Sequence, residues 1–166
     1  MFAISSVADL TAERRVFEAW SLQVPVTFEE VFVREDSYWH AYDEHRSVSL
    51  TSLVLEEGRR PVVASRILKR LPVLDGTPVF EMPVGLAGVA ATCAAEQPAR
   101  ASQVLVGLLV TDGRTLVVTI TTDDLAWARR VWLSISFHDA PSPPVRSPTG
   151  VVPEPGAEAR PIPPAS

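Results

Sequence analysis

The stretch that decides the fold runs from Ala101 to Phe137 and reads ASQVLVGLLV (101–110), TDGR (111–114), TLVVTITT (115–122) and DDLAWARRVWLSISF (123–137). Asp112-Gly113 separates two apolar runs, and this dipeptide is a strong hairpin signal because a type I′ turn needs positive φ at both central residues. The second run is rich in β-branched residues, which favour strands. The stretch therefore predicts two antiparallel strands joined by a tight turn.

A two-residue turn at Asp112-Gly113 also predicts which residues of the two strands lie opposite one another. One face is expected to carry the pairs Leu109–Leu116, Gly107–Val118 and Leu105–Ile120. The other face is expected to carry the pairs Leu108–Val117, Val106–Thr119 and Val104–Thr121. A sheet with one solvated face alternates more cleanly than this. We therefore expect the second face to be covered by a helix of the same chain, a second sheet, a partner or a ligand.

The residues after the hairpin predict a helix that packs on it. Asp123 and Asp124 are suitable capping residues. The helix would have one broad apolar face, made of Leu125, Ala128, Val131, Trp132 and Ile135. We expect this face to press on the hairpin, where Gly107 leaves room opposite Val118 for the Trp132 indole.

The rest of the chain predicts further strands and short helices. Apolar spacing favours an amphipathic helix over Asp9–Trp20. It also favours a short helix with Pro61 at its first position, which continues to Leu71 and which Pro72 would end. Strands are expected at Val24–Val33, Ser37–Tyr42, Ser47–Leu55 and Val79–Met82, with a charged loop at Glu56–Arg60. The segment Gly85–Gln97 suits either a helix or a strand, and strand is favoured. Together these segments predict an α+β fold, a largely antiparallel sheet of about six or seven strands packed with two to three helices.

The composition divides the chain of 166 residues into two regions. Residues 1–139 are expected to form a single domain. Residues 140–166 hold nine of the chain's 15 prolines and no aromatic residue. Such a segment buries too little apolar surface to offset its ordering entropy, so we expect a disordered Pro-rich tail. Its Pro-x-x-Pro pairs suit either a solubilising extension or an adaptor ligand in a polyproline II helix.

Charge and hydropathy argue against several classes of partner. The net charge is −5, and basic residues cluster only as the pairs Arg59-Arg60 and Arg129-Arg130, so no nucleic-acid partner is expected. No apolar window approaches the roughly 20 residues that span a bilayer, so no membrane association is expected. The first residues lack a basic region and a sustained apolar run, which favours a cytoplasmic protein. Cys93 is the single cysteine, so neither an intramolecular disulfide nor a multi-cysteine metal site is expected.

The densest polar cluster is Tyr38-Trp39-His40-Ala41-Tyr42-Asp43-Glu44-His45. Two histidines and two carboxylates could bind zinc or form an acid–base pair. On a strand, however, His40 and His45 project to opposite faces because their separation is odd. We therefore expect an aromatic strand followed by a solvated turn, with no metal and no cofactor. The chain has no Gly-x-Ser-x-Gly motif, and Ser49, Thr51 and Ser52 lie on a predicted strand without a neighbouring base.

The order of elements resembles that of a known group of proteins. The hairpin, acidic cap and helix ending in Val131-Trp-Leu-Ser-Ile-Ser-Phe137 look like the C-terminal end of the Mog1/PsbP-like group. The aromatic strand, the next strand, the short helix, the Pro-rich connector and the small-residue strand precede them in the same order. The resemblance covers about Thr27–Phe137 and implies a sheet sandwiched by helices. It also implies a non-enzymatic binding or assembly role, while no functional residue of the group matches a position of this chain.

Two functions are compatible with the sequence. The lack of a catalytic constellation favours a non-enzymatic binding or assembly module that contacts a protein partner through a sheet face or through the aromatic strand. The alternative is a small-ligand-binding protein or enzyme with a pocket between helix and sheet, lined by Tyr38, Tyr42 and Trp127. Self-association is compatible with either function. The candidate binding residues are therefore Tyr38, Trp39, His40, Tyr42 and Trp127, and no catalytic residue is assigned.

Overall fold

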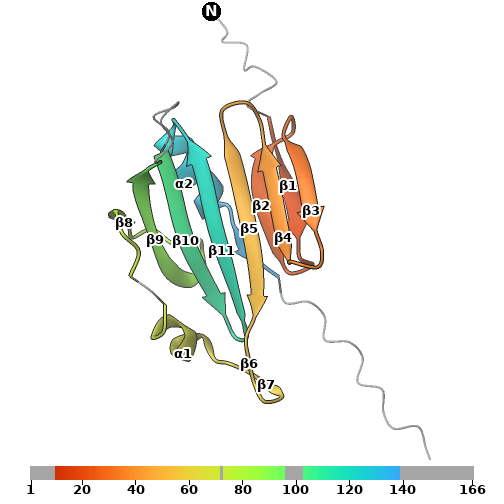
Figure 1. The fold of residues 1–166 in the computed structure, drawn as a ribbon, viewed down its shortest axis with the longest axis vertical. Helices are drawn as coiled ribbons and strands as arrows, with labels where there is room; N and C mark the ends of the chain where they lie inside the picture. Colours follow the sequence, from red (N-terminus) through yellow and green to blue (C-terminus); the bar gives the residue numbers. More distant parts are fainter. Residues whose placement is uncertain (1–9, 72, 96–102, 139–166) are drawn as a thin grey trace, which may run out of the picture.

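The computed structural model of the chain describes residues 10–71, 73–95 and 103–138. Its main unit, the large sheet, has seven antiparallel strands in the order β3-β4-β5-β11-β10-β9-β8 (Figure 1). These strands are β3 (Glu29–Val33), β4 (Tyr38–Tyr42), β5 (Ser47–Val54), β8 (Thr77–Val79), β9 (Ala87–Ala94), β10 (Gln103–Thr111) and β11 (Arg114–Thr122). A second, three-stranded sheet has the order β1-β2-β12, with β1 (Thr11–Val16), β2 (Trp20–Pro25) and β12 (Ser136–Phe137). The described residues also form the small ribbon β6 (Glu56–Glu57) and β7 (Arg60–Pro61), and the helices α1 (Ala64–Leu68) and α2 (Leu125–Leu133).

The predicted register of the central hairpin is confirmed. β10 and β11 pair Leu109 with Leu116, Gly107 with Val118 and Leu105 with Ile120. The three pairs expected on the other face are present as well, Leu108–Val117, Val106–Thr119 and Val104–Thr121. A mixed fold dominated by an antiparallel sheet, with two helices in the described residues, is therefore observed as expected.

The expectation of a type I′ turn in this hairpin is wrong. Gly113 has φ +76°, whereas Asp112 is not among the residues with positive φ. The turn is held by the segment that follows β5, because the Ala64 N–H donates to Asp112 Oδ1 at 2.8 Å and the Gly113 N–H donates to the Val62 carbonyl at 2.7 Å. The local signal predicted where the chain turns, and tertiary hydrogen bonds selected the turn conformation.

The main core lies between one face of the large sheet and a layer made of α2 and the β1-β2-β12 sheet. In Figure 1, α2 lies behind β10 and β11. Trp132 is fully buried, and its indole N–H donates to the Glu81 carbonyl at 2.9 Å. A side chain at Gly107 would overlap the Trp132 ring. The expected contact of the helix with the hairpin is therefore confirmed.

The helix predicted over Asp9–Trp20 is wrong. Residues 11–16 form β1, which pairs with β2 from Thr11–Pro25 to Val16–Trp20. Phe17 and Glu18 adopt positive φ, 53° and 63°, and reverse the chain. On β1, Ala12, Arg14 and Val16 are less exposed than their neighbours, which is a strand period of two. Sequence periodicity missed this strand because an arginine occupies one of the inward positions.

Other expected boundaries need smaller corrections. The strand expected over Val24–Val33 is two strands, because a turn closed by the Phe28 N–H and the Pro25 carbonyl carries the chain from β2 to β3. The helix expected from Pro61 to Leu71 is limited to α1. The short strand expected at Val79–Met82 is displaced toward the N-terminus, because β8 shares only Val79 with the expected range. The expected charged loop contains the paired β6 and β7. The strand favoured for Gly85–Gln97 is confirmed as β9. The strands expected at Ser37–Tyr42 and Ser47–Leu55 are β4 and β5.

The second face of the large sheet is covered at one end. α1 packs over this end, where Leu108, Val110 and Thr115 are buried. The predicted tail, residues 140–166, lies outside the described residues. Within the described ranges, no helix is long and apolar enough to cross a membrane.

Candidate functional site

The face of the large sheet opposite α2 is the candidate site. We call it the open face and define it by eleven half-buried side chains: Tyr38, His40 and Tyr42 on β4, Ser47, Ser49 and Thr51 on β5, Val117, Thr119 and Thr121 on β11, and Val104 and Val106 on β10. In Figure 1, β10 and β11 lie in front of α2, so the open face is on the side of the sheet turned toward the viewer. The residues that alternate with these side chains, such as Trp39, Leu50 and Val118, are buried in the core. The open face is therefore one continuous surface that the core does not use.

The open face changes chemically from one side to the other. Aromatic rings on β4 give way to hydroxyl groups on β5 and to valines on β10 and β11. None of the eleven side chains is a carboxylate, a lysine or an arginine. A solvated face of an antiparallel sheet usually carries polar or charged residues. The mixture of aromatic, hydroxyl and aliphatic groups is closer to the core of a protein interface, where charged residues are depleted and aromatic residues enriched.

Tyr38, His40 and Tyr42 form a stacked aromatic row along β4. The Tyr38 and His40 rings have centroids 6.1 Å apart and an interplanar angle of 11°, and the His40 and Tyr42 rings are 5.1 Å apart at 23°. The Tyr42 hydroxyl donates to Glu29 Oε2 at 3.0 Å. This hydrogen bond and the charge of Glu29 raise the pKa of Tyr42. The three rings therefore form one continuous aromatic surface along β4.

His40 also contacts a serine on the neighbouring strand. Its Nδ1 lies 2.8 Å from Ser49 Oγ, and the Tyr38 hydroxyl lies 3.4 Å from the same oxygen. The expectation that Ser49 has no neighbouring base is therefore wrong, because the β4–β5 register places His40 directly opposite it. Burial lowers the pKa of His40, against a smaller opposing effect of a hydrogen bond to the backbone of Val48. His40 is accordingly neutral at physiological pH.

A serine beside a neutral histidine is the start of a nucleophilic pair, but a triad also needs a group that orients the base and donors for an oxyanion. Within the described residues, no carboxylate is bonded to the His40 ring. The backbone amide groups around Ser49 belong to a central strand that pairs with both β4 and β11. Among the described residues, the Tyr38–His40–Ser49 group is therefore a set of hydrogen-bonding side chains without the further parts of a triad.

The structure separates the five candidate binding residues between two faces. Tyr38, His40 and Tyr42 lie on the open face, whereas Trp39 and Trp127 are buried in the core. The expected pocket lined by Tyr38, Tyr42 and Trp127 is consequently not formed, because β4 lies between the tyrosines and the tryptophan. Trp39 donates its indole N–H to Glu30 Oε2 at 3.2 Å. Trp127 packs on Phe28 with the ring centroids 5.9 Å apart.

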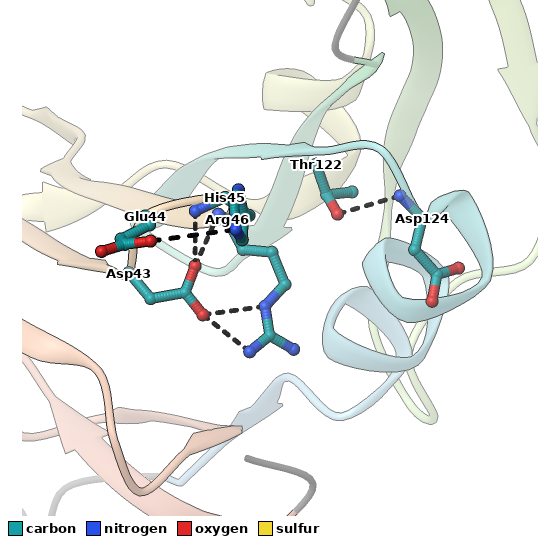
Figure 2. Close-up of polar contacts among 6 residues, drawn as sticks. All are labelled: Asp43, Glu44, His45, Arg46, Thr122 and Asp124. Carbon is teal, nitrogen blue, oxygen red and sulfur yellow. Dashed lines mark hydrogen bonds and ion pairs between the residues drawn. The ribbon is translucent and has the colours of Figure 1, made fainter.

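Arg46, in the β4–β5 turn, packs on the ring of Trp127. Its guanidinium lies 5.1 Å from the Trp127 ring centroid and 5.3 Å from that of Phe28. On its other side, Arg46 donates to Asp43 Oδ2 from Nε at 2.9 Å and from a terminal nitrogen at 2.6 Å (Figure 2). Arg46 thereby links the β4–β5 turn to α2.

The turn at Asp43–His45 does not bring His40 and His45 together into one site. Asp43 Oδ1 accepts the backbone N–H groups of His45 and Arg46 at 2.8 and 2.7 Å, while His45 itself is exposed and lies 3.9 Å from Glu44 (Figure 2). Burial raises the pKa of Asp43, but the hydrogen bonds from Arg46 and the two backbone N–H groups, together with the Arg46 charge, outweigh it and lower the pKa below its ordinary value. In the described part of the chain, no group of three or more His, Cys, Asp or Glu side chains could hold a metal ion.

Comparison with known proteins provides information on the fold alone. No protein-family model matches the chain, and no curated protein matches it. Among solved structures, the chain resembles a crystal structure of a protein from Bacteroides thetaiotaomicron VPI-5482 determined at 1.50 Å resolution, with a TM-score of 0.53 and 9% sequence identity. The match covers 72% of this chain and 45% of that chain. The chain therefore spans less than half the length of that protein, and at this identity the likeness concerns the arrangement of secondary structure.

Sequence reasoning missed the contact between His40 and the Ser49 hydroxyl group on the open face. The alternation in Ser47–Leu55 was visible, and so was the alternation in Ser37–Tyr42. Pairing these two strands through the turn at residues 43–46 would have placed His40 opposite Ser49. The signal that was not used is the turn chemistry of Asp43, whose carboxylate accepts the backbone N–H groups two and three residues later.

Proposed function

We propose that the chain is a non-enzymatic protein-binding or assembly module that uses the open face of the large sheet. The observation that carries the proposal is the chemistry of this face, eleven half-buried side chains without a carboxylate, lysine or arginine. The resemblance to the Mog1/PsbP-like group, whose members are chiefly binding or assembly factors, supports the same function. A cavity beneath α1 favours a second candidate function, the binding of a small ligand at a place other than the one expected.

The aromatic row is the proposed anchor of the interface. Tyr38 and Tyr42 offer large rigid surfaces with hydroxyl groups at their tips, which is why tyrosine is enriched at interfaces. The hydroxyl groups of Ser49 and Thr119 lie on adjacent strands in direct register, and they supply hydrogen bonds in the centre. The eleven side chains of the open face carry no full charge at neutral pH, and Glu29 lies at their edge, opposite Tyr42. Complex formation should therefore depend only weakly on ionic strength.

A pair of matched substitutions tests this proposal. Thr119→Lys places a charge at the centre of the open face, while Thr11→Lys places the same charge on the exposed strand β1. Captures from a native lysate with the wild-type protein and both variants should identify a protein whose recovery falls only with Thr119→Lys. The purified partner should then bind the Thr119→Lys variant about tenfold or more weakly than wild type, since burying an unpaired charge costs several kcal/mol.

Two results would contradict the proposal. The first is a partner whose binding is reduced equally by both substitutions, or by neither, when both variants unfold at the wild-type temperature. The second is an affinity that falls steeply with added salt, which would assign binding to a charged surface elsewhere. If the recovered protein is the chain itself, sedimentation of the wild type and Thr119→Lys should show a dimer that only the Thr119→Lys substitution dissociates.

A further inference from the structure

A cavity lies between α1 and one end of the large sheet, separate from the open face. Its volume is about 410 Å³, toward the small end of the roughly 300–1,000 Å³ that is usual for ligand sites. Its walls are mainly aliphatic and come from β5, the segment after β5, α1 with its following turn, and β10: Leu53, Leu55, Val62, Ile67, Leu71 and Leu108. A cavity with these walls suits an apolar chain.

One polar group is buried in this cavity without a partner. Thr115 lines it and is 3% exposed. Its Oγ1 makes no hydrogen bond within the described part of the chain. Thr115 lies opposite Leu53 on one side and Val110 on the other, which puts its side chain on the face that α1 covers. Buried hydroxyl groups are nearly always hydrogen-bonded, so Thr115 offers an unused donor and acceptor to a ligand.

The mouth of the cavity carries Arg70 and Glu56. Arg70 is exposed and has no ion pair in the described ranges, whereas the neighbouring Arg66 pairs with Glu57 at 2.7 Å. The mouth is therefore suited to an anion, and Glu56 is the one lining residue that opposes it.

We propose that this cavity binds a small amphiphilic carboxylate, such as a short- or medium-chain fatty acid. The aliphatic chain lies between Leu53, Ile67 and Leu108. The carboxylate accepts a hydrogen bond from the Thr115 hydroxyl and a charge-assisted one from the Arg70 guanidinium. This inference is independent of the proposed protein interface, because none of these residues belongs to the open face.

Calorimetric titration of the whole chain with octanoate, and with octanol as the uncharged counterpart, tests the site. Wild type should bind both compounds, octanoate more tightly. Leu53→Trp fills the cavity from its rim and should abolish both titrations. Thr115→Val removes only the hydroxyl and should lower the affinity for octanoate about five- to tenfold, as the loss of one hydrogen bond does. The same variant should unfold at a higher temperature than wild type without ligand, because its buried side chain no longer carries an unpaired hydroxyl.

Substitutions of the charged residues at the mouth distinguish the contribution of the ligand's carboxylate from that of its aliphatic chain. Arg70→Gln should lower the affinity for octanoate and leave the affinity for octanol unchanged. Glu56→Gln should raise the affinity for octanoate and leave that for octanol unchanged. Arg66→Gln is the control: it removes a nearby arginine on α1 and should change neither affinity, since Arg66 does not line the cavity. The proposal is overturned if wild type binds no octanoate at millimolar concentration, or if Leu53→Trp binds it with wild-type affinity. It is also overturned if Arg70→Gln weakens octanol as much as octanoate.

Discussion

Gly107 on β10 and Trp132 on α2 occupy one packing site, because a Cβ atom at residue 107 would overlap ring atoms of Trp132. Gly107 is directly opposite Val118 in the hairpin. The ring fills the space that the missing side chain leaves. The indole N–H reaches past the sheet to the Glu81 carbonyl, so the same side chain also holds the segment after β8. This contact fixes how α2 lies on the large sheet.

Replacing either residue of this pair should destabilise the fold, and the two effects should not add. Trp132→Ala removes a fully buried aromatic ring and should cost about 3–5 kcal/mol in the free energy of unfolding. Gly107→Val overpacks the same place and should cost about 1–3 kcal/mol. Chemical denaturation of the two single variants and the double variant measures the coupling. Gly107→Val combined with Trp127→Ala is the control, and its effects should add because Trp127 packs on Phe28 and Arg46 instead.

Asp124 should stabilise the start of α2. Its Oδ1 accepts the Trp127 N–H at 3.0 Å. Its own N–H donates to Thr122 Oγ1 at 3.0 Å (Figure 2). Asp124→Ala should lower the free energy of unfolding by about 0.5–2 kcal/mol, as the loss of a helix N-cap does. Asp123→Ala is the control, because the Asp123 side chain makes no hydrogen bond to any described residue. Equal losses in the two variants would mean that the helix dipole, rather than the cap, accounts for the effect.

The Asp43–Arg46 pair should make stability fall in acid. Because the pKa of Asp43 is lowered in the folded state, the contribution is complete above the unfolded pKa of about 3.8 and is lost as pH falls through the folded value. Asp43→Asn should therefore be less stable than wild type at neutral pH, and the difference should shrink at about pH 3 and below. Urea denaturation across this range measures it. Asp36→Asn, at an exposed turn position, should show no such convergence.

His40 should make the protein less stable in mild acid. Burial lowers the pKa of His40 from 6.5, so below that value the unfolded state binds more protons and stability falls as pH decreases. Wild type should lose stability between about pH 7.5 and about pH 5.5, and His40→Gln should lose less. His45→Gln is the matched control on an exposed side chain. A wild-type profile in the His40→Gln variant would show that another group carries the acid dependence.

The Pro-rich segment should be dispensable for folding. A chain that ends at Asp139 should unfold at nearly the same temperature as the full chain, because the core is built from residues up to Phe137. Differential scanning calorimetry of both chains compares the two temperatures directly. A decrease of many degrees would mean that residues 140–166 pack on the domain.

Much of the large sheet could be predicted from local patterns. The alternation of β4 and β5, the turn dipeptide before β11 and the apolar face of α2 all depend on neighbours in sequence. For that reason the hairpin register, the acidic cap and the Gly107–Trp132 contact were predictable. β1 was not, because its inward position at Arg14 is polar and is compensated by Glu30 on another strand.

The candidate sites depended on contacts between distant segments. The central hairpin, its register and the helix that covers it were predictable from local signals, because turn chemistry and side-chain periodicity act over a few residues. The shared face of Tyr38, His40 and Tyr42 with Ser49 and Thr119, and the place of Trp39 and Trp127 in the core, came from long-range strand pairing. Strand pairing sets this division, since a strand projects alternate side chains to opposite faces and its neighbours determine which face joins the core. In the same way, α1 and β10 lie about 40 residues apart in sequence, and their packing forms the cavity around Thr115.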